Sequence, residues 1–185
     1  MTGSSETKRP LVVLIGPPGA GKTRLGKRVA RILGAPFIDT DRLIVAQHGP
    51  IPEIFNSLGE PEFRRIERAI VAEALEEAAV VSLGGGAVLS AETQAQLASR
   101  HVALITVSAE AVASRIGGSK RPLARDMDAW AALVDSRREL YERLATATWD
   151  TSSRPIDHIA ADIADWVADH GRPAPTSTIV TEEAP

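Results

Sequence analysis

The sequence contains no cysteine among its 185 residues, which excludes disulfides and thiolate metal sites and suits a reducing compartment. No apolar run approaches the length of a membrane span, and residues 1–10 lack the apolar stretch of a signal peptide. Neither sign of charge dominates, because the formal net charge is only -3. Nothing therefore favours attraction to nucleic acid or to an anionic membrane. We expect a cytoplasmic protein with neither as a partner.

Internal repeats and domain linkers are also missing, and short apolar runs alternate with longer helical patterns. We expect one domain over residues 10–170, flanked by disordered ends at 1–9 and 171–185. The strand–helix alternation predicts a mainly parallel sheet with helices on both faces, and ligands beyond the carboxyl ends of its strands. The patterns predict strands at 11–15, 36–39, 80–83, 101–107 and, more weakly, 148–151, and helices at 21–33, 61–78, 90–99, 127–147 and 155–169.

Residues 16–23, GPPGAGKT, match the phosphate-binding pattern G-x-x-x-x-G-K-[ST] between an apolar strand and a helix. The glycines allow backbone N–H groups to converge on phosphate oxygens, and the helix adds the positive end of its dipole. Lys22 is expected to reach the β- and γ-phosphates, and the Thr23 hydroxyl to bind Mg²⁺. The alternative is a glycine-rich turn with a chance lysine. No N-K-x-D motif of a GTPase is present, so the pattern favours a small phosphotransferase.

Two aspartates lie at the end of the second expected strand, where the γ-phosphate should point. A carboxylate at this position, Asp39 or Asp41, can orient or accept the proton of an attacking hydroxyl. The other can hold Mg²⁺ through its water shell. The alternative is that Asp41 merely caps the helical stretch that follows it.

Two arginines interrupt apolar helix faces and suggest a small acidic substrate. Arg137 lies on the apolar stripe of the helix at 127–147, and its guanidinium requires an anionic partner there. It could instead extend to solvent or bond a buried aspartate. Arg64 lies where the apolar face of the helix at 61–78 becomes charged, although Arg64 and Glu67 could be only a surface pair.

Two glycine-rich segments complete the set of candidates. Gly84, Gly85 and Gly86 follow the third expected strand and allow close backbone approach to a ligand, or form only a flexible turn. The segment 117–125 has a glycine hinge and a basic tip. We expect it to act as a mobile lid that brings Arg121 to the phosphates and excludes water, unless it is an ordinary basic loop.

The ordered motifs GPPGAGKT, DTD, EFRRIE, SLGGGA, GGSKRPL and RRELY resemble those of shikimate kinases over roughly residues 11–160. The resemblance implies a three-layer α/β/α P-loop domain with a five-stranded parallel sheet and a mobile lid. It also implies transfer of the γ-phosphoryl group of ATP to the 3-hydroxyl of shikimate, giving shikimate 3-phosphate and ADP. That reaction belongs to chorismate and aromatic amino-acid biosynthesis. The implied partners are ATP, shikimate and Mg²⁺, and we expect a monomer.

Carried over to this sequence, the resemblance implies a role for each motif residue. Asp41 would position or deprotonate the 3-hydroxyl, and Asp39 would lie near the water shell of the metal. Arg64, Arg137 and the glycine loop would hold the shikimate carboxylate. The ATP-binding set would comprise Pro18, Gly19, Ala20, Gly21, Lys22, Thr23 and the lid residue Arg121, with Arg115 and Arg154 near the adenine.

Three other interpretations of these motifs stay open. A gluconate-type kinase of the same superfamily would carry different acceptor motifs, and a nucleoside monophosphate kinase would show a nucleobase-binding arrangement. A catalytically silent ATP-binding module would bind ATP without transferring phosphate. The filled catalytic positions favour the shikimate kinase interpretation.

Overall fold

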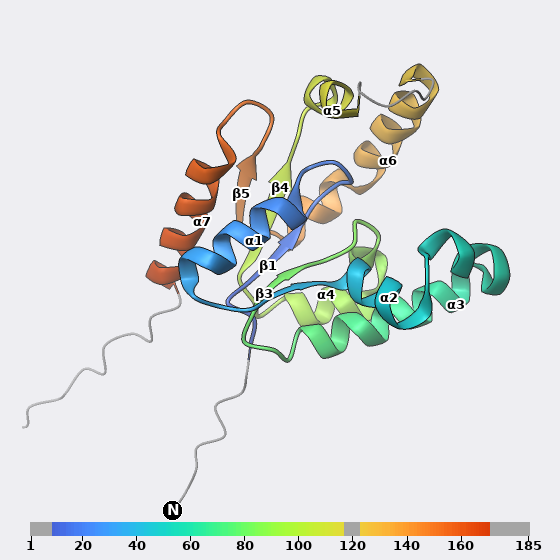
Figure 1. The fold of residues 1–185 in the computed structure, drawn as a ribbon, viewed down its shortest axis with the longest axis horizontal. Helices are drawn as coiled ribbons and strands as arrows, with labels where there is room; N and C mark the ends of the chain where they lie inside the picture. The colour runs from blue at the N-terminus through green and yellow to red at the C-terminus, as the bar shows by residue number, and fades with distance from the viewer. Residues whose placement is uncertain (1–8, 117–122, 171–185) are drawn as a thin grey trace, which may run out of the picture.

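The computed structural model describes residues 9–116 and 123–170, and these form a three-layer α/β/α domain (Figure 1). Its sheet has five strands in the order β2-β3-β1-β4-β5, and every neighbouring pair is parallel. The strand β1 is therefore central, with β3 on one side and β4 on the other. The strands are β1 (Val12–Ile15), β2 (Phe37–Asp39), β3 (Val80–Ser82), β4 (Val102–Thr106) and β5 (Ala147–Asp150).

Helices follow the strands and cover both faces of the sheet (Figure 1). One face packs against α1 and α7, and the other against α3, α4 and the C-terminal part of α6. A short 3-10 helix, η1 (Ala87–Leu89), follows the glycine loop. The α-helices are α1 (Lys22–Leu33), α2 (Thr40–His48), α3 (Ile51–Ala74), α4 (Ala91–Leu97), α5 (Ala109–Ile116), α6 (Leu123–Leu144) and α7 (Ile156–His170).

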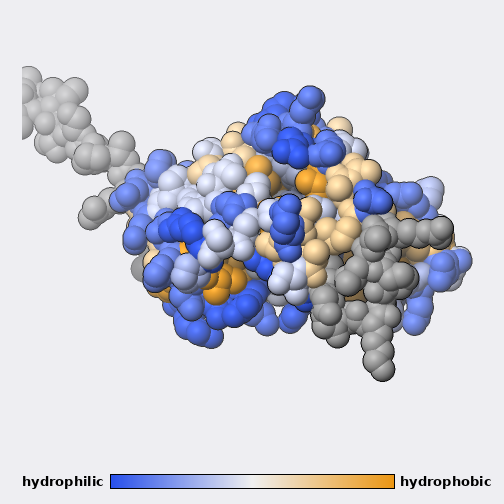
Figure 2. All heavy atoms as spheres, turned by 90° about the horizontal axis from the view of Figure 1, so that it is seen from above, coloured by the Kyte–Doolittle hydropathy of each residue, from blue (hydrophilic) through white to orange (hydrophobic). Residues whose placement is uncertain are grey.

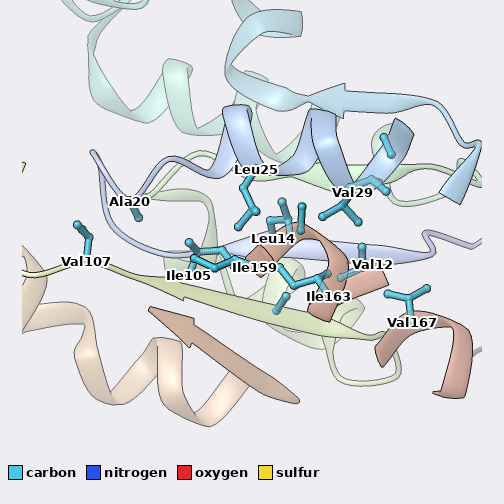
Figure 3. Close-up of a cluster of buried hydrophobic side chains, with 14 of the residues drawn as sticks. Val12, Leu14, Ala20, Leu25, Val29, Ile105, Val107, Ile159, Ile163 and Val167 are labelled. Carbon is cyan, nitrogen blue, oxygen red and sulfur yellow. The ribbon is translucent and has the colours of Figure 1, made fainter. Parts of the chain in front are cut away.

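The central strand is buried on both faces, which explains its unbroken apolar run. Val12 and Leu14 belong to the core under α1 and α7, shown in Figure 3. Val13 and Ile15 belong to the core under α3 and α4. Each such side chain stabilises the fold by about 1.5–3 kcal/mol relative to exposure. The phosphate-binding segment thus begins at the best-anchored strand of the sheet.

A third, smaller core joins α2 to α3, away from the sheet. Its buried members are Ile44, Ile54, Phe63, Ile66 and Ile70. This cluster holds the segment that carries Arg64 against the rest of the molecule.

The expected fold class is confirmed, and all five strands form, including the weakly indicated one. The helix expected at 61–78 is different in extent, because α3 already begins at Ile51 and ends at Ala74. Gly59 has φ 80° and ψ 169°, so the backbone bends there, and Pro61 opens the second half. Sequence patterns recognised only that second half as a helix.

Within the described residues, no helix has both the length and the hydropathy needed to cross a bilayer. The face shown in Figure 2 is mostly hydrophilic, with small separated hydrophobic spots. The expected disordered ends and the tip of the expected lid, residues 117–122, lie outside the described residues.

Candidate functional site

The phosphate-binding loop joins β1 to α1, and its glycines are required by its geometry. Gly16 has φ 139°, and a Cβ atom there would lie 2.2 Å from the carbonyl oxygen of Ile105. Gly21 is the N-cap of α1, with φ 84°, and brings no capping side chain to the helix. The N–H groups of the first turn are therefore available to an anion, which the helix dipole also attracts.

Lys22 lies inside this loop rather than extending to solvent. Its Nζ donates hydrogen bonds to the carbonyl oxygens of Gly16 (2.8 Å) and Pro17 (3.0 Å). Burial lowers the pKa of Lys22 to about 8, although Asp41 and Asp39 act in the opposite direction. A bound phosphate would add negative charge beside the ammonium group and favour its charged form.

Asp39 ends β2 and reaches both the phosphate loop and the start of α2. Its carboxylate accepts a hydrogen bond from the Thr23 hydroxyl at 2.6 Å and another from the backbone N–H of Arg42 at 3.2 Å. Asp39, and not Asp41, is therefore the N-cap of α2. The capping alternative considered for Asp41 is wrong, because Asp41 already lies in the first turn of the helix.

Asp41 faces the glycine loop across the end of the sheet. A Cβ atom on Gly84 would lie only 2.3 Å from Oδ1 of Asp41, so a larger residue at Gly84 would displace the carboxylate. Burial raises the pKa of Asp41, and Asp39 raises it further, while Lys22 and Arg64 lower it. One hollow brings together the phosphate loop and both aspartates. Its lining is Pro18, Gly19, Gly21, Lys22, Thr23, Arg24, Asp39, Asp41, Ser82 and Leu83.

Arg64 reaches the glycine loop from α3. Its Nη1 lies 2.6 Å from Glu67 Oε2, and a Cβ atom on Gly86 would lie 2.5 Å from the same nitrogen. Glu67 is only 4% exposed, so the pair is not the surface pair that the sequence allowed. Burial raises the pKa of the Glu67 carboxyl, while the hydrogen bond from Arg64 lowers it.

Arg137 reaches the same loop from α6. Its Nη1 donates a hydrogen bond of 3.1 Å to the carbonyl oxygen of Gly85. The two arginines singled out from the apolar faces of separate helices therefore both contact the glycine loop. A small anion seated on that loop would meet two guanidinium groups.

The two arginines expected near the adenine lie on the other side of the phosphate loop. Arg115 donates to the carbonyl oxygen of Gly19 at 3.0 Å and also bonds the backbone of Thr151. Arg154 is half-exposed and pairs with Asp162 at 2.7 Å. Arg115 and Arg154 line a second hollow, together with Gly19, Ala20, Gly21, Arg24, Thr151 and Ile156. Arg121 lies outside the described residues.

Two contributors to the site were not assigned from the sequence. The buried Thr40 hydroxyl donates to the carbonyl oxygen of Ser82 (3.3 Å) and accepts from the N–H of Gly84 (3.2 Å). The Tyr141 hydroxyl donates to the carbonyl oxygen of Gly85 at 2.6 Å. Both hold the glycine loop in place. Both lie within motifs of the resemblance, Thr40 between the aspartates of DTD and Tyr141 at the end of RRELY, but neither motif indicated this role.

Comparisons with known proteins agree on one family. The family model described as "Shikimate kinase" matches residues 18–168. The shikimate kinase of Corynebacterium efficiens is 46% identical over 160 residues, which is 84% of this chain and 95% of the relative. That of Streptomyces coelicolor is 39% identical over 163 residues, covering 85% and 95%.

Solved structures extend the agreement to three dimensions. The shikimate kinase from Acinetobacter baumannii, solved in complex with shikimate, is similar with a TM-score of 0.79 at 31% identity, covering 89% of this chain and 96% of that one. A gluconokinase from Sinorhizobium meliloti has a TM-score of 0.60 at 22% identity, covering 86% and 91%, and shares the fold. With the phosphate loop, the paired aspartates and the glycine loop in their expected places, these matches show that the chain belongs to the shikimate kinase family.

Proposed function

We propose that this protein transfers the γ-phosphoryl group of ATP to the 3-hydroxyl of shikimate, giving shikimate 3-phosphate and ADP. The reaction belongs to chorismate and aromatic amino-acid biosynthesis. The observation that carries the proposal is the convergence of Asp41, Arg64 and Arg137 on one glycine loop beside the phosphate loop. Family membership at 46% identity over most of the chain supports it.

In this proposal the donor side neutralises charge and fixes the phosphates. Phosphoryl transfer requires alignment and electrostatic stabilisation more than covalent catalysis by the protein. The N–H groups of residues 18–23 and the Lys22 ammonium would hold the phosphates, and Arg121 would add a further positive charge. Arg115 and Arg154, which line the second hollow, would contact the nucleotide base.

On the acceptor side, the oxygen of the 3-hydroxyl would form a bond to the γ-phosphorus while the bond from that phosphorus to the bridging β-phosphate oxygen breaks. Asp41 would receive the proton that the hydroxyl loses. The acceptor carboxylate would be held by the guanidinium groups of Arg64 and Arg137 and by the backbone of Gly84, Gly85 and Gly86. Glu67 keeps Arg64 in place through the 2.6 Å ion pair. These contacts would orient the hydroxyl toward the phosphate loop.

The residues at the end of the phosphate loop fit Mg²⁺. The Thr23 hydroxyl donates a hydrogen bond to Asp39, which leaves the lone pairs of the hydroxyl oxygen free. Hydroxyl and carboxylate oxygens are ligands that Mg²⁺ accepts. Thr23 would bind the ion directly and Asp39 through water. When bound, the ion would neutralise negative charge on the phosphates.

A comparison of acceptors tests the proposal. We expect ADP release from ATP and Mg²⁺ to depend on shikimate, and to remain at background with gluconate, a nucleoside monophosphate or no acceptor. Gluconate is included because of the gluconokinase fold match. Turnover with gluconate and not with shikimate would identify gluconate as the acceptor. ATP binding without turnover on any acceptor would favour a catalytically silent ATP-binding module. The monomeric state and cytoplasmic location stay predictions from the sequence.

A further inference from the structure

Five consecutive carbonyl groups of the phosphate loop accept hydrogen bonds from side chains, the last of them, at Ala20, from the Thr151 hydroxyl at 2.9 Å. Lys22 accounts for two of them, at Gly16 and Pro17. The next, at Pro18, accepts from Nε1 of Trp130 at 2.8 Å, and that at Gly19 accepts from Nη1 of Arg115 at 3.0 Å. Lys22 and Arg115 already have proposed roles toward ATP, whereas nothing above assigns one to Trp130.

The direction of the Pro18 carbonyl also sets the direction of the next N–H group. A trans peptide unit is planar, so its C=O and N–H bonds point in opposite directions. Holding the Pro18 carbonyl toward α6 therefore directs the Gly19 N–H away from α6, in the opposite direction within the peptide plane. Gly19 has φ 83°, and a glycine gives little steric resistance to rotation of this peptide. A rotated peptide would exchange the positions of the N–H donor and the carbonyl oxygen and so repel phosphate.

Trp130 is suited to hold this peptide. It lies on α6 and packs partly against the core beneath α1, so its ring has a fixed position from which the indole N–H reaches the loop. The other two tryptophans, Trp149 and Trp166, contact each other with ring centroids 5.3 Å apart. Trp166 also contacts His101 and His170, at the opposite end of β4 from the site.

We infer that Trp130 is a positioning residue for the ATP phosphates, acting through the hydrogen bond from its indole N–H to the Pro18 carbonyl. This inference rests on the proposed use of ATP but does not depend on the identity of the acceptor. The bond keeps the Pro18–Gly19 peptide in the orientation that binds phosphate. Loss of this hydrogen bond should weaken the binding of ATP. Binding of the acceptor should be unchanged, because the acceptor side contacts α6 through Arg137 and Tyr141 instead.

The variant Trp130→Phe tests this, because it removes the N–H donor and keeps an aromatic ring in the core. We expect the Kd of Mg²⁺–ATP, measured by titration calorimetry, and the KM for ATP to rise about 3- to 10-fold, the range for loss of one neutral hydrogen bond. The matched control is Trp166→Phe. The KM for shikimate and the thermal midpoint of unfolding should be the same in Trp130→Phe as in this control. An unchanged ATP Kd in folded Trp130→Phe, or an equal rise in both KM values, would overturn the inference.

Tryptophan fluorescence gives a second, independent readout. In the wild-type protein and in Trp166→Phe, ATP should change the emission, because its charged phosphates bind beside the Trp130 indole. Trp130→Phe should lose this response. If Trp130→Phe does not fold, the response of Trp166→Phe decides: no change on saturation with ATP overturns the inference. Wild-type protein that binds ATP but does not phosphorylate shikimate would instead overturn the proposed function.

Discussion

Asp41→Asn is expected to lower kcat by about 10²- to 10⁴-fold, the usual contribution of a general base. Asparagine has nearly the same shape as aspartate, so it should keep the packing of residue 41 against Gly84. The amide cannot accept the hydroxyl proton, so both substrates should bind while transfer slows. The assay is shikimate-dependent ADP release, with both KM values and the thermal midpoint measured alongside.

The pH dependence of the wild-type rate provides the companion test. Only the ionised Asp41 carboxylate accepts a proton, so kcat/KM should rise with pH through its pKa and be lost below it. Because burial raises that pKa, the loss should begin at a higher pH than for a solvent-exposed aspartate. Asp135→Asn, which changes an exposed carboxylate on α6, is the control and should behave like wild type. Near-normal kcat in Asp41→Asn would remove Asp41 from the proposed mechanism.

Arg137→Ala should raise the KM for shikimate about 10²-fold and leave the KM for ATP nearly unchanged. Loss of one partner of a charge-assisted contact costs about 2–5 kcal/mol, and a tenfold change corresponds to 1.4 kcal/mol. The glycine loop itself should stay in place, because the Tyr141 hydroxyl still donates to the Gly85 carbonyl. Steady-state kinetics with each substrate varied in turn measures the two effects separately.

The neighbouring arginine supplies the matched control. Arg138 is exposed and pairs with Asp135 at 2.6 Å, one position along the same helix. Arg138→Ala removes the same charge from α6 without touching the glycine loop, and both KM values should remain within about twofold of wild type. An equal rise of both KM values in Arg137→Ala would show that the residue supports the fold and not the acceptor.

The sheet was predictable from the sequence because parallel strands buried on both faces are continuously apolar, as in residues 12–15. The edge strand β5 was only weakly indicated, since its side chains alternate between partly buried and exposed. The sequence pattern did not predict the first half of α3, because Gly59 and Pro61 are typical of the end of one element and the start of another. Packing between α2 and α3 in the small third core helps to stabilise the helix before that bend.

Motif residues at strand ends were predictable for a similar reason, because a parallel sheet brings its carboxyl ends together. Thus Asp39 and Asp41 lie beside Lys22 as expected. Contacts from α6 were harder to predict, since they depend on how a distant helix is rotated. The bond from Trp130 to Pro18 spans 112 positions, and the bond from Tyr141 to Gly85 spans 56. No local pattern encodes such pairs.

The separate small core under α2 and α3 implies that the two halves of the site have unequal resistance to local unfolding. The central strand β1 is hydrogen-bonded on both sides, so its amides should exchange with solvent only when the whole sheet opens. The cluster around Phe63 and Ile66, which carries Arg64, lies apart from the sheet and has fewer buried members. It can open as a subglobal unit while the sheet persists. In mild denaturant, recognition of the acceptor should therefore fail before recognition of the nucleotide.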